Sequence, residues 1–296
     1  MRIVAVGDNV VDCYPRLGRR YPGGNAYGVA VHARRCGAAT GYVGAVGDDA
    51  AGTLMRDALH AEGVDTARLR VLPGATATAT VDLVAGERTF LGNDKGISLI
   101  TPTPDDLRYV ASFDAAHTSC YSRLEEHLAD LARRVPVSYD FGYRREPRYA
   151  VPLLVFCHLA TFSGSDLSDE RTDALLRWAH GNGARYALVT RGASGAHLFD
   201  GRRVHHKPTL STTVVDTLGA GDSFIARTLV GLLAGEPVPQ VLAAAAAVAA
   251  ATCGHLGSIG RGAALPPDSR LPQVLVDVSR VFLERPPAAL ADTSRE

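Results

Sequence analysis

The sequence has no net charge and few aromatic residues. Its 31 Lys and Arg residues balance 31 Asp and Glu residues, and aromatic residues make up 6% of the chain. Proteins that bind duplex nucleic acid carry a surplus of positive charge that releases counterions, so no nucleic-acid partner is expected. Without such a field, any anion site must be built locally. Hydrophobic residues make up 46%, which excludes a disordered chain.

Cysteine pairs and long hydrophobic runs are also missing. The five cysteines are far apart and form no CxxC pair, which predicts free thiols in a reducing compartment. The longest apolar stretch, Val241–Cys253, is mostly alanine and is shorter than the ~20 residues that span a bilayer. No basic segment precedes the apolar run at Ile3, so no signal peptide is predicted. We therefore expect a cytoplasmic protein with no membrane partner.

Motifs of several other enzyme classes are absent. The first predicted strand is not followed by GxGxxG, which argues against a dinucleotide-binding oxidoreductase. No Gly-Lys pair occurs, so a Walker-type P-loop is excluded. His205 and His206 form the only histidine doublet, but on a strand their side chains point to opposite faces, which disfavours a shared metal ion.

Short apolar runs alternate with amphipathic segments along the chain. The runs predict buried strands at Ile3–Val6, Gly41–Val46, Ala115–His117, Val137–Asp140, Leu153–His158 and Tyr186–Thr190. The amphipathic segments predict helices at Asn25–Arg35, Ala51–Glu62, Arg123–Arg134 and Asp169–Asn182. An antiparallel hairpin is predicted from His197–Phe199 and Val204–His206. This order predicts an α/β protein with a mostly parallel sheet covered on both faces.

One segment, Ala75–Phe90, breaks this alternation of strands and helices. It alternates small or apolar residues with threonine and polar residues and turns at Ala85-Gly86, which indicates a hairpin with one solvated face. We expect a β-flap of residues 12–22 and 75–95 on an α/β core of residues 1–11, 23–74 and 96–285. The last residues, 286–296, follow a Pro-rich stretch and are expected to be frayed.

The stretch DTLGAGDSF at Asp216–Phe224, followed by a helical run, carries the most specific chemistry. Gly219, Ala220 and Gly221 let the backbone approach a ligand, and a helix starting there directs free N–H groups and its positive dipole end at one point. Such a turn forms an anion hole without net positive charge. Asp222 at its mouth would repel a stored phosphate, but it suits a base that receives a proton from an attacking hydroxyl. The alternative is an ordinary helix start with an acid in its first turn.

This string resembles the C-terminal signature of the ribokinase-like (PfkB) family of carbohydrate kinases. Other segments resemble the same family in the same order along the chain. They are GDNVVD at Gly7–Asp12, GGNA at Gly23–Ala26, GAVGDD at Gly44–Asp49 and VTRGASG at Val189–Gly195. The resemblance covers residues 1–260 and implies a three-layer α/β/α sandwich with a mostly parallel central sheet and a small β-sheet lid.

The resemblance also implies a role for each matching residue. Asp222 is implied as the base that activates the acceptor hydroxyl, and Gly219, Ala220 and Gly221 as the anion hole for the γ-phosphoryl group. The implied sugar ligands are Asp8, Asp12, Gly24 and Asn25, and the implied nucleotide contacts are Thr190, Gly192, Gly195, Gly219 and Gly221. The flap corresponds to the lid that excludes water. The resemblance implies ATP as co-substrate with Mg²⁺, and it allows a monovalent cation such as K⁺.

Three positions depart from the family pattern. Where the family has an NxxE motif that organises Mg²⁺, this chain has FSGSD at Phe162–Asp166, so Asp166 is the candidate metal residue. Gly28 stands where a further asparagine is usual. Arg227 stands where the helix after the base usually has glycine, so its side chain must point outward or pair with an acid.

Details within the motifs indicate a branch of the family. Cys13-Tyr14-Pro15, Ser138–Phe141 and a GGNA without lysine resemble fructoselysine 6-kinases, which phosphorylate the 6-hydroxyl of Amadori sugars, in which an amino acid is joined to fructose. Glu87 or Asp94 on the flap is the candidate contact for the ammonium group of such a substrate. Another sugar or nucleoside kinase of the same fold is the alternative, and a sensor without catalysis is a more remote one. The exposed face of the flap also suits a homodimer.

Overall fold

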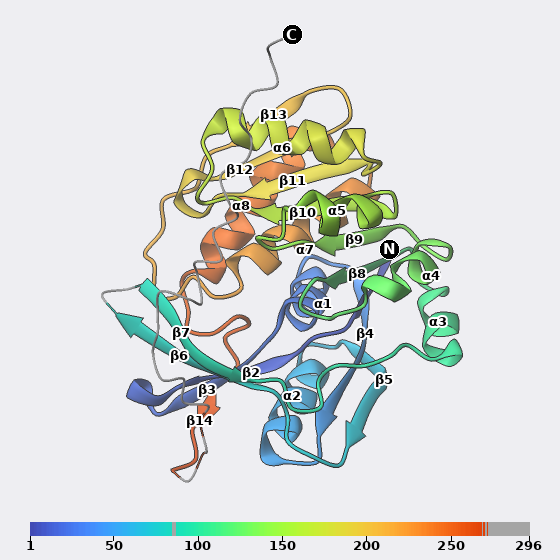
Figure 1. The fold of residues 1–296 in the computed structure, drawn as a ribbon. Coiled ribbons are helices and arrows are strands. Elements are labelled where there is room, and N and C mark those ends of the chain that lie inside the picture. The colour runs from blue at the N-terminus through green and yellow to red at the C-terminus, as the bar shows by residue number, and fades with distance from the viewer. Residues whose placement is uncertain (85–86, 268, 270, 272–296) are drawn as a thin grey trace.

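The computed structural model describes residues 1–84, 87–267, 269 and 271. Within these ranges the largest element is a nine-stranded sheet (Figure 1). From edge to edge its strands are β13 (Val204–Lys207), β12 (Ala196–Phe199), β11 (Tyr186–Thr190), β10 (Cys157–Ser163), β9 (Val137–Asp140), β8 (Ala115–Ser119), β1 (Arg2–Val6), β4 (Ala39–Gly47) and β5 (Asp65–Leu72). The strands from β11 to β5 run parallel, and the β12–β13 hairpin adds an antiparallel edge.

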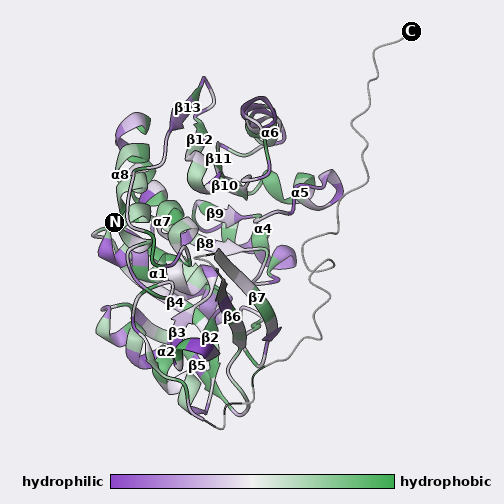
Figure 2. Ribbon diagram, turned by 90° about the vertical axis from the view of Figure 1, so that its left-hand side faces the viewer, coloured by the Kyte–Doolittle hydropathy of each residue, from purple (hydrophilic) through white to green (hydrophobic). Residues whose placement is uncertain are grey.

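Helices cover both faces of this sheet (Figure 2). One layer holds α1 (Asn25–Arg35), α2 (Ala50–Ala61), α7 (Ala220–Leu233) and α8 (Val238–Thr252), and the other holds α3 (Pro104–Val110), α4 (Leu128–Ala132), α5 (Pro147–Leu154) and α6 (Asp169–Gly181). The first layer buries side chains such as Val29 and Leu242 against the sheet, and the second buries Leu154 and Leu176. The predicted three-layer α/β/α sandwich is therefore confirmed.

A second, five-stranded sheet lies beside the main body. Its order is β14 (Ala263–Ala264), β3 (Arg19–Gly23), β2 (Val10–Tyr14), β6 (Thr78–Val84) and β7 (Glu87–Asp94). Figure 1 shows β6 and β7 as a long hairpin that projects from the molecule. Tyr14, Tyr21 and Val81 form a small core with Leu218, which belongs to the loop before α7. The expected small sheet is thus present, while the turn at 85–86 and the tail 286–296 lie outside the described residues.

The expected strand at Leu153–His158 is wrong in its first half. α5 ends at Leu154, and β10 begins at Cys157. Pro147 opens α5, and Ala150, Leu153 and Leu154 are buried at the three- and four-residue spacing of a helix. The apolar run is therefore shared between the end of a helix and the start of a strand.

Two further elements differ from the expectation. The helix expected at Arg123–Arg134 is confined to a 3₁₀ turn, η2 (Glu125–His127), and the short α4. The edge strand β5 was not expected because its sequence, DTARLRVL, is charged and largely accessible to solvent. Two other 3₁₀ turns, η1 (Pro15–Leu17) and η3 (Gly192–Ser194), complete the regular elements of the described chain.

The alanine-rich segment forms the packed helix α8 rather than a membrane span. Val241, Leu242 and Ala245 are buried, and α8 lies along α7. None of the helices in the described ranges combines the length and hydropathy that crossing a bilayer requires. All five cysteines are free thiols, as expected.

Candidate active site

Polar side chains gather where the central strands of the large sheet end. Ser119 and Asp140 are the last residues of the neighbouring strands β8 and β9, and Asp8 closely follows β1. Helices α1 and α7, which lie side by side in Figure 1, begin at the same edge and contribute Asn25 and Asp222. In open α/β sheets, ligands bind outside the carboxyl ends of the strands. This edge is therefore the candidate active site.

Asn25 connects the carboxylates of this edge. Its side-chain nitrogen donates hydrogen bonds to Asp222 Oδ1 at 2.8 Å and to Asp140 Oδ2 at 2.9 Å. Because one NH₂ group serves both carboxylates, the two acids are held close together without a cation between them. The amide nitrogen of Asn25 thus positions Asp222, and the contact of Asn25 with the sugar stays a prediction.

His117 fixes the orientation of the Asn25 amide. Its Nε2 lies 2.9 Å from Asn25 Oδ1, and its Nδ1 lies 3.0 Å from the Ser138 hydroxyl. Complete burial lowers the pKa of His117 to about 3, so the ring is neutral at physiological pH. Since Asn25 Oδ1 can only accept, Nε2 carries the proton and Nδ1 accepts from Ser138. His117 was not expected in the site, although its place at the carboxyl end of a predicted strand was a usable signal.

Asp140 is a buried acid, and its burial disfavours the charged form of the carboxyl group. Burial raises the pKa of Asp140 to about 6, and the negative charge of Asp8 also raises it. The hydrogen bonds from the Gly142 N–H and from the Asn25 amide lower it. From the sequence, Asp140 is expected at the end of a strand and within a motif typical of one branch of the family. In the structure it is a partner of the base candidate through Asn25.

The raised pKa of Asp140 predicts a stability change with pH. The folded pKa lies above the unfolded one, so the ionised carboxyl destabilises the fold above about pH 6, and protonation removes that cost as pH falls toward about 4. As pH falls from about 6 to about 4, the free energy of unfolding of the wild type is expected to rise by about 1–3 kcal/mol relative to that of Asp140→Asn. Urea denaturation of both proteins measures this difference. A difference that is constant with pH would contradict the prediction.

Asp8 binds the start of α1. Its Oδ2 accepts from the Asn25 backbone N–H at 2.7 Å and its Oδ1 from the Ala26 N–H at 3.3 Å. The hydroxyls of Ser119 and Ser122 also donate to Oδ1, at 3.0 and 2.7 Å. Because a carboxylate oxygen has two lone pairs, only Oδ2 has room for another donor. The predicted sugar contact of Asp8 is therefore limited to one oxygen, and most of its hydrogen bonds fix α1 and the loop after β8.

Asp12 and two glycines pack where β2 meets the start of α1. Asp12 is 1% exposed, and a Cβ built on Gly23 would lie 2.1 Å from its Oδ2. Gly24 has φ +104°, and a Cβ there would lie 2.6 Å from the Cα of Asn9. Gly24 is thus required by the backbone conformation. A hydroxyl contact from Asp12 stays a prediction.

The turn before α7 directs backbone amides outward. Gly219 has φ +80°, and a Cβ on it would lie 2.5 Å from Ser258 Oγ, so only glycine fits. Among the described residues, the N–H groups of Gly219 and Gly221 meet no acceptor, whereas the Ala220 N–H donates to Thr217 O at 3.3 Å. The predicted anion hole therefore has two available amides at these positions instead of three. Gly221 is exposed, with no atom within 4 Å of its Cβ position.

Asp222 stands in the first turn of α7 above Gly28 of α1. A Cβ on Gly28 would lie 3.0 Å from Asp222 Oδ2 and 3.1 Å from Ser258 Oγ. A side chain at position 28 would therefore press on the Asp222 carboxylate. The missing family asparagine leaves this space open, and Asn25, one helical turn earlier, provides the amide that contacts Asp222.

The candidate nucleotide loop follows β11. Thr190 ends the strand, Gly192 has φ +56° with open space around it, and the Thr209 hydroxyl donates to Gly192 O at 2.9 Å. Gly195 has φ +86°, and a Cβ there would lie 2.2 Å from Lys207 O. Gly195 thus allows the close β12–β13 pairing, and Thr190, Gly192 and Gly195 all stay predicted nucleotide contacts.

Asp166 is paired with a cation in the structure, and its metal role stays a prediction. Its carboxylate forms an ion pair with Arg145 at 2.7 Å and is half-exposed. A cation already neutralises this group, which lowers its value as a metal ligand. No group of three His, Cys, Asp or Glu side chains in the described ranges is arranged to hold a metal ion.

Arg227 pairs with an acid, which is one of the two arrangements expected for it. Its guanidinium pairs with Glu236 at 2.6 Å and is partly buried. The side chain lies across Gly231, where a Cβ would be 2.6 Å from Arg227 Nη1. Arg227 therefore pairs with an acid just beyond the end of α7.

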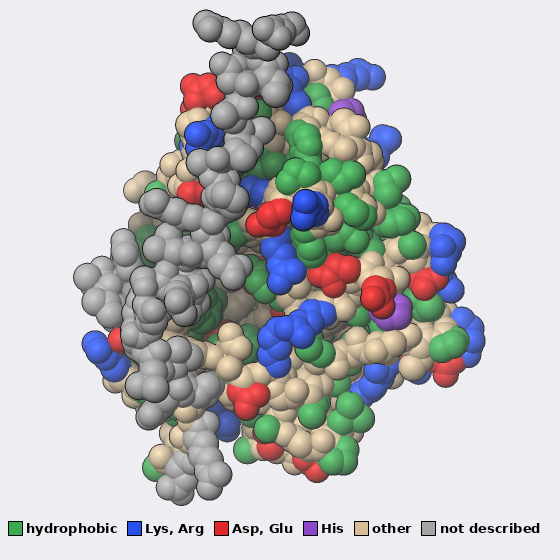
Figure 3. Space-filling view, viewed as in Figure 1, with side chains coloured by type: hydrophobic (Ala, Val, Ile, Leu, Met, Phe, Trp, Pro, Cys, Tyr) green, Lys and Arg blue, Asp and Glu red, His purple; other side chains and the backbone are tan. Residues whose placement is uncertain are grey.

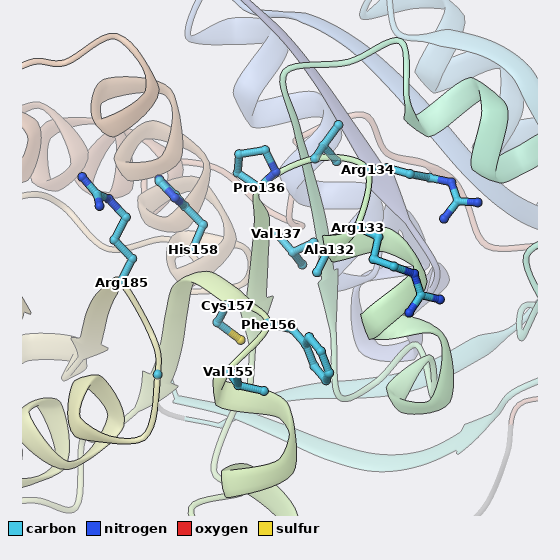
Figure 4. A pocket seen from close by; sticks show the side chains of 12 residues that line it. Ala132, Arg133, Arg134, Pro136, Val137, Val155, Phe156, Cys157, His158 and Arg185 are labelled. Atoms are coloured by element: carbon cyan, nitrogen blue, oxygen red, sulfur yellow. The ribbon is translucent and has the colours of Figure 1, made fainter.

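A pocket of about 430 Å³ lies at the opposite edge of the sheet (Figure 4). Val137 and Cys157, the first residues of β9 and β10, line it together with three arginines. Figure 4 shows Arg133 and Arg134 pointing away from Arg185, so their guanidinium groups do not converge on one anion. This pocket is separate from the candidate active site.

The chain matches a known protein family and curated relatives over most of its length. The model of the pfkB family carbohydrate kinases matches residues 3–135 and 158–262. The chain is 41% identical to fructosamine kinase FrlD of Bacillus subtilis over 267 residues, which cover 88% of this chain and 94% of that protein. It is 32% identical to fructoselysine 6-kinase of Escherichia coli, over 86% of this chain and 98% of that protein.

Solved structures show the same fold. Ribokinase of Arabidopsis thaliana, complexed with ribose and ATP, superposes with a TM-score of 0.78 at 24% identity, over 88% of this chain and 95% of that chain. Aminoimidazole riboside kinase of Salmonella enterica gives 0.71 at 22% identity, over 90% and 97%. The family match includes Asp8, Asn25 and Asp222 of the site. The chain therefore belongs to the PfkB family of carbohydrate kinases.

Proposed function

We propose that this carbohydrate kinase transfers the γ-phosphoryl group of ATP to the 6-hydroxyl group of fructoselysine or a related Amadori sugar. The observation that carries the reaction is the Asp222 carboxylate, held by Asn25 beside the available amides of Gly219 and Gly221. The acceptor is supported by two relatives, named fructosamine kinase and fructoselysine 6-kinase, that match this chain over nearly their whole length.

In the proposed reaction, the 6-hydroxyl oxygen bonds to the γ-phosphorus while the bond to the β–γ bridging oxygen breaks and ADP leaves. Asp222 receives the hydroxyl proton. An aspartate with an ordinary pKa of ~3.9 is a weak base toward an alcohol, but phosphoryl transfer has a loose transition state in which the proton can leave late. The amides of Gly219 and Gly221 and the dipole of α7 stabilise the charge of the migrating group. Mg²⁺ enters with ATP as part of the substrate.

The small sheet is proposed to act as a lid over the sugar. The Tyr14 hydroxyl of β2 donates to Asp216 Oδ2 at 2.6 Å, and Asp216 also accepts from the N–H groups of Leu218 and Gly257. Because Leu218 directly precedes Gly219, this contact connects the lid to the anion turn. A lid suits the reaction because water would otherwise compete for the phosphoryl group. A homodimer through the flap and a monovalent cation stay predictions.

A substrate panel tests the proposed function. Purified protein with Mg·ATP is assayed for ADP release with fructoselysine, fructose, ribose and adenosine. We expect kcat/KM for fructoselysine to exceed the others by about tenfold or more, because the amino acid part adds binding contacts that the simple sugars lack. A preference for fructose, ribose or adenosine would instead identify another sugar or nucleoside kinase. Sugar binding without ADP release would indicate the sensor.

A further inference from the structure

Three cationic side chains stand at the rim of the candidate active site. Lys95 directly follows β7 of the flap, while Arg123 and Arg144 each lie four residues beyond the ends of β8 and β9. Because β8 and β9 are adjacent and parallel, the loops that follow them meet at the same edge of the sheet. Figure 3 shows Lys and Arg side chains near the middle of the face drawn there, with Asp and Glu side chains beside them.

The three cations share one electrostatic environment with the site. Burial lowers the pKa of Lys95, the charges of Arg123 and Arg144 lower it further, and the carboxylate of Asp8 raises it. The charges of both arginines and of Asp8 therefore act on the Lys95 ammonium group. Gathering like charges in this way costs free energy unless an anion joins them.

The carboxylates of Asp8 and Glu125 act on Lys95 and Arg144 from a distance, but no anion of the described chain pairs directly with the three cations. Neither Lys95, Arg123 nor Arg144 forms an ion pair with any described residue, although the neighbouring Arg145 pairs with Asp166. The Arg144 guanidinium instead lies over the Tyr149 ring, 4.9 Å from its centroid, which holds it in place through the ring face. The N–H groups at the edge of the guanidinium can then donate hydrogen bonds to a planar anion such as a carboxylate.

Arg123 has an unusual backbone conformation. With φ +54° it is the one non-glycine residue with a left-handed conformation in the ranges that the structure describes. Its neighbours fix that conformation: the Ser122 hydroxyl donates to Asp8 Oδ1 at 2.7 Å and accepts from the Asp8 N–H at 3.1 Å, and Leu124 is fully buried. A non-glycine residue persists in this region only where its surroundings impose it, which is typical of functional sites.

On the basis of the proposed function, we propose that Lys95, Arg123 and Arg144 bind the carboxylate of the amino acid part of the Amadori substrate. The 6-hydroxyl group must lie at Asp222, and the amino acid is attached at the opposite end of the sugar. The γ-phosphoryl group is assigned to the start of α7, so these cations are left for the acceptor. A simple sugar is neutral and gives three cations no partner, whereas a carboxylate matches both an ammonium and a guanidinium group.

The test compares substrates that differ only in the carboxylate. The pairs are fructosylglycine with 1-deoxy-1-(methylamino)fructose, and ε-fructoselysine with fructosylcadaverine. We expect the wild type to prefer the carboxylated member of at least one pair by about tenfold in kcat/KM. Lys95→Met and Arg144→Gln should each remove most of this preference by raising KM for the carboxylated sugar, with KM for ATP unchanged.

Two further variants separate binding from folding. Arg123→Gly suits the left-handed backbone, so it should remove the preference without loss of thermal stability. Arg148→Gln neutralises an exposed cation on the nearby α5 and should leave the preference intact. Three results would each overturn the proposal while the kinase assignment stands. The wild type could use both members of each pair equally, the variants could lose kcat/KM equally for both members, or the variants could have a raised KM for ATP. If no Amadori compound is phosphorylated but fructose or ribose is, the proposed function itself fails.

Discussion

Replacing Asp222 by asparagine is expected to lower kcat by ~10²–10⁴-fold, the usual contribution of a positioned general base. Asparagine keeps the size of the side chain and still accepts the hydrogen bond from Asn25 through its oxygen, but it cannot take a proton. The loss should appear in ADP release under saturating Mg·ATP and sugar. Dissociation constants for sugar and for ATP, measured by calorimetry, should stay within about threefold of the wild type.

Asp57→Asn is a suitable control for Asp222→Asn because Asp57 is an exposed carboxylate on α2, far from the sheet edge that holds the site. Its kcat should equal that of the wild type. ADP release unchanged in Asp222→Asn would remove Asp222 from the reaction. Weakened sugar binding with unchanged kcat would make Asp222 a sugar ligand instead of the base.

The parts of the fold that the sequence predicts well are those in which local pattern and burial agree. The run at Ile3–Val6 is continuous and apolar and becomes a buried parallel strand. Val137–Asp140 also becomes a buried strand, although it contains Ser138 and Asp140. The run at Leu153–His158 misleads because apolar content alone does not separate a buried helix end from a buried strand. Edge strand β5 is missed because an accessible strand does not need apolar residues.

The candidate site was predictable only where its residues belong to one continuous motif. The turn at Gly219–Asp222 combines glycines, a helix start and an acid within four residues. His117 and Asp140 lie on different strands, and the sheet topology, which no local pattern specifies, brings both to Asn25. The donors that Asp8 receives from the start of α1 and from Ser119 and Ser122 are likewise a property of packing, so its residue type alone suggested a freer ligand than the structure provides.

Replacing Asn25 by aspartate is expected to lower kcat by ~10²–10³-fold at about pH 8 and to restore part of it as pH falls. The substitution keeps the shape of the side chain but exchanges the shared NH₂ donor for an oxygen. At high pH, the new carboxylate would then lie within hydrogen-bond distance of both the Asp140 and the Asp222 carboxylates, and Asp222 would lose the donor that holds it. The free energy of unfolding should also fall, by about 3–5 kcal/mol, because a buried charge is left unpaired.

The direction of the pH effect follows from the same repulsion. Burial beside two acids raises the folded pKa of the new carboxyl above its unfolded value of ~3.9, so the destabilisation is complete above the folded pKa and is relieved as pH falls through it. A protonated aspartic acid at position 25 has one O–H and can again donate to Asp222. Turnover and unfolding of the variant, each divided by the wild-type value at the same pH, should therefore recover together on acidification.

Asn182→Asp provides the matched control because it makes the same substitution at the end of α6, away from the site. A negative charge there slightly weakens the helix, but the ratio of its turnover to that of the wild type should not change with pH. A loss in Asn25→Asp that is equal at every pH would mean that Asn25 only fills space. Recovery at low pH requires a donor at position 25, and His117 cannot replace it, because its ring is neutral and its Nε2–H is directed at the Oδ1 position of the same side chain.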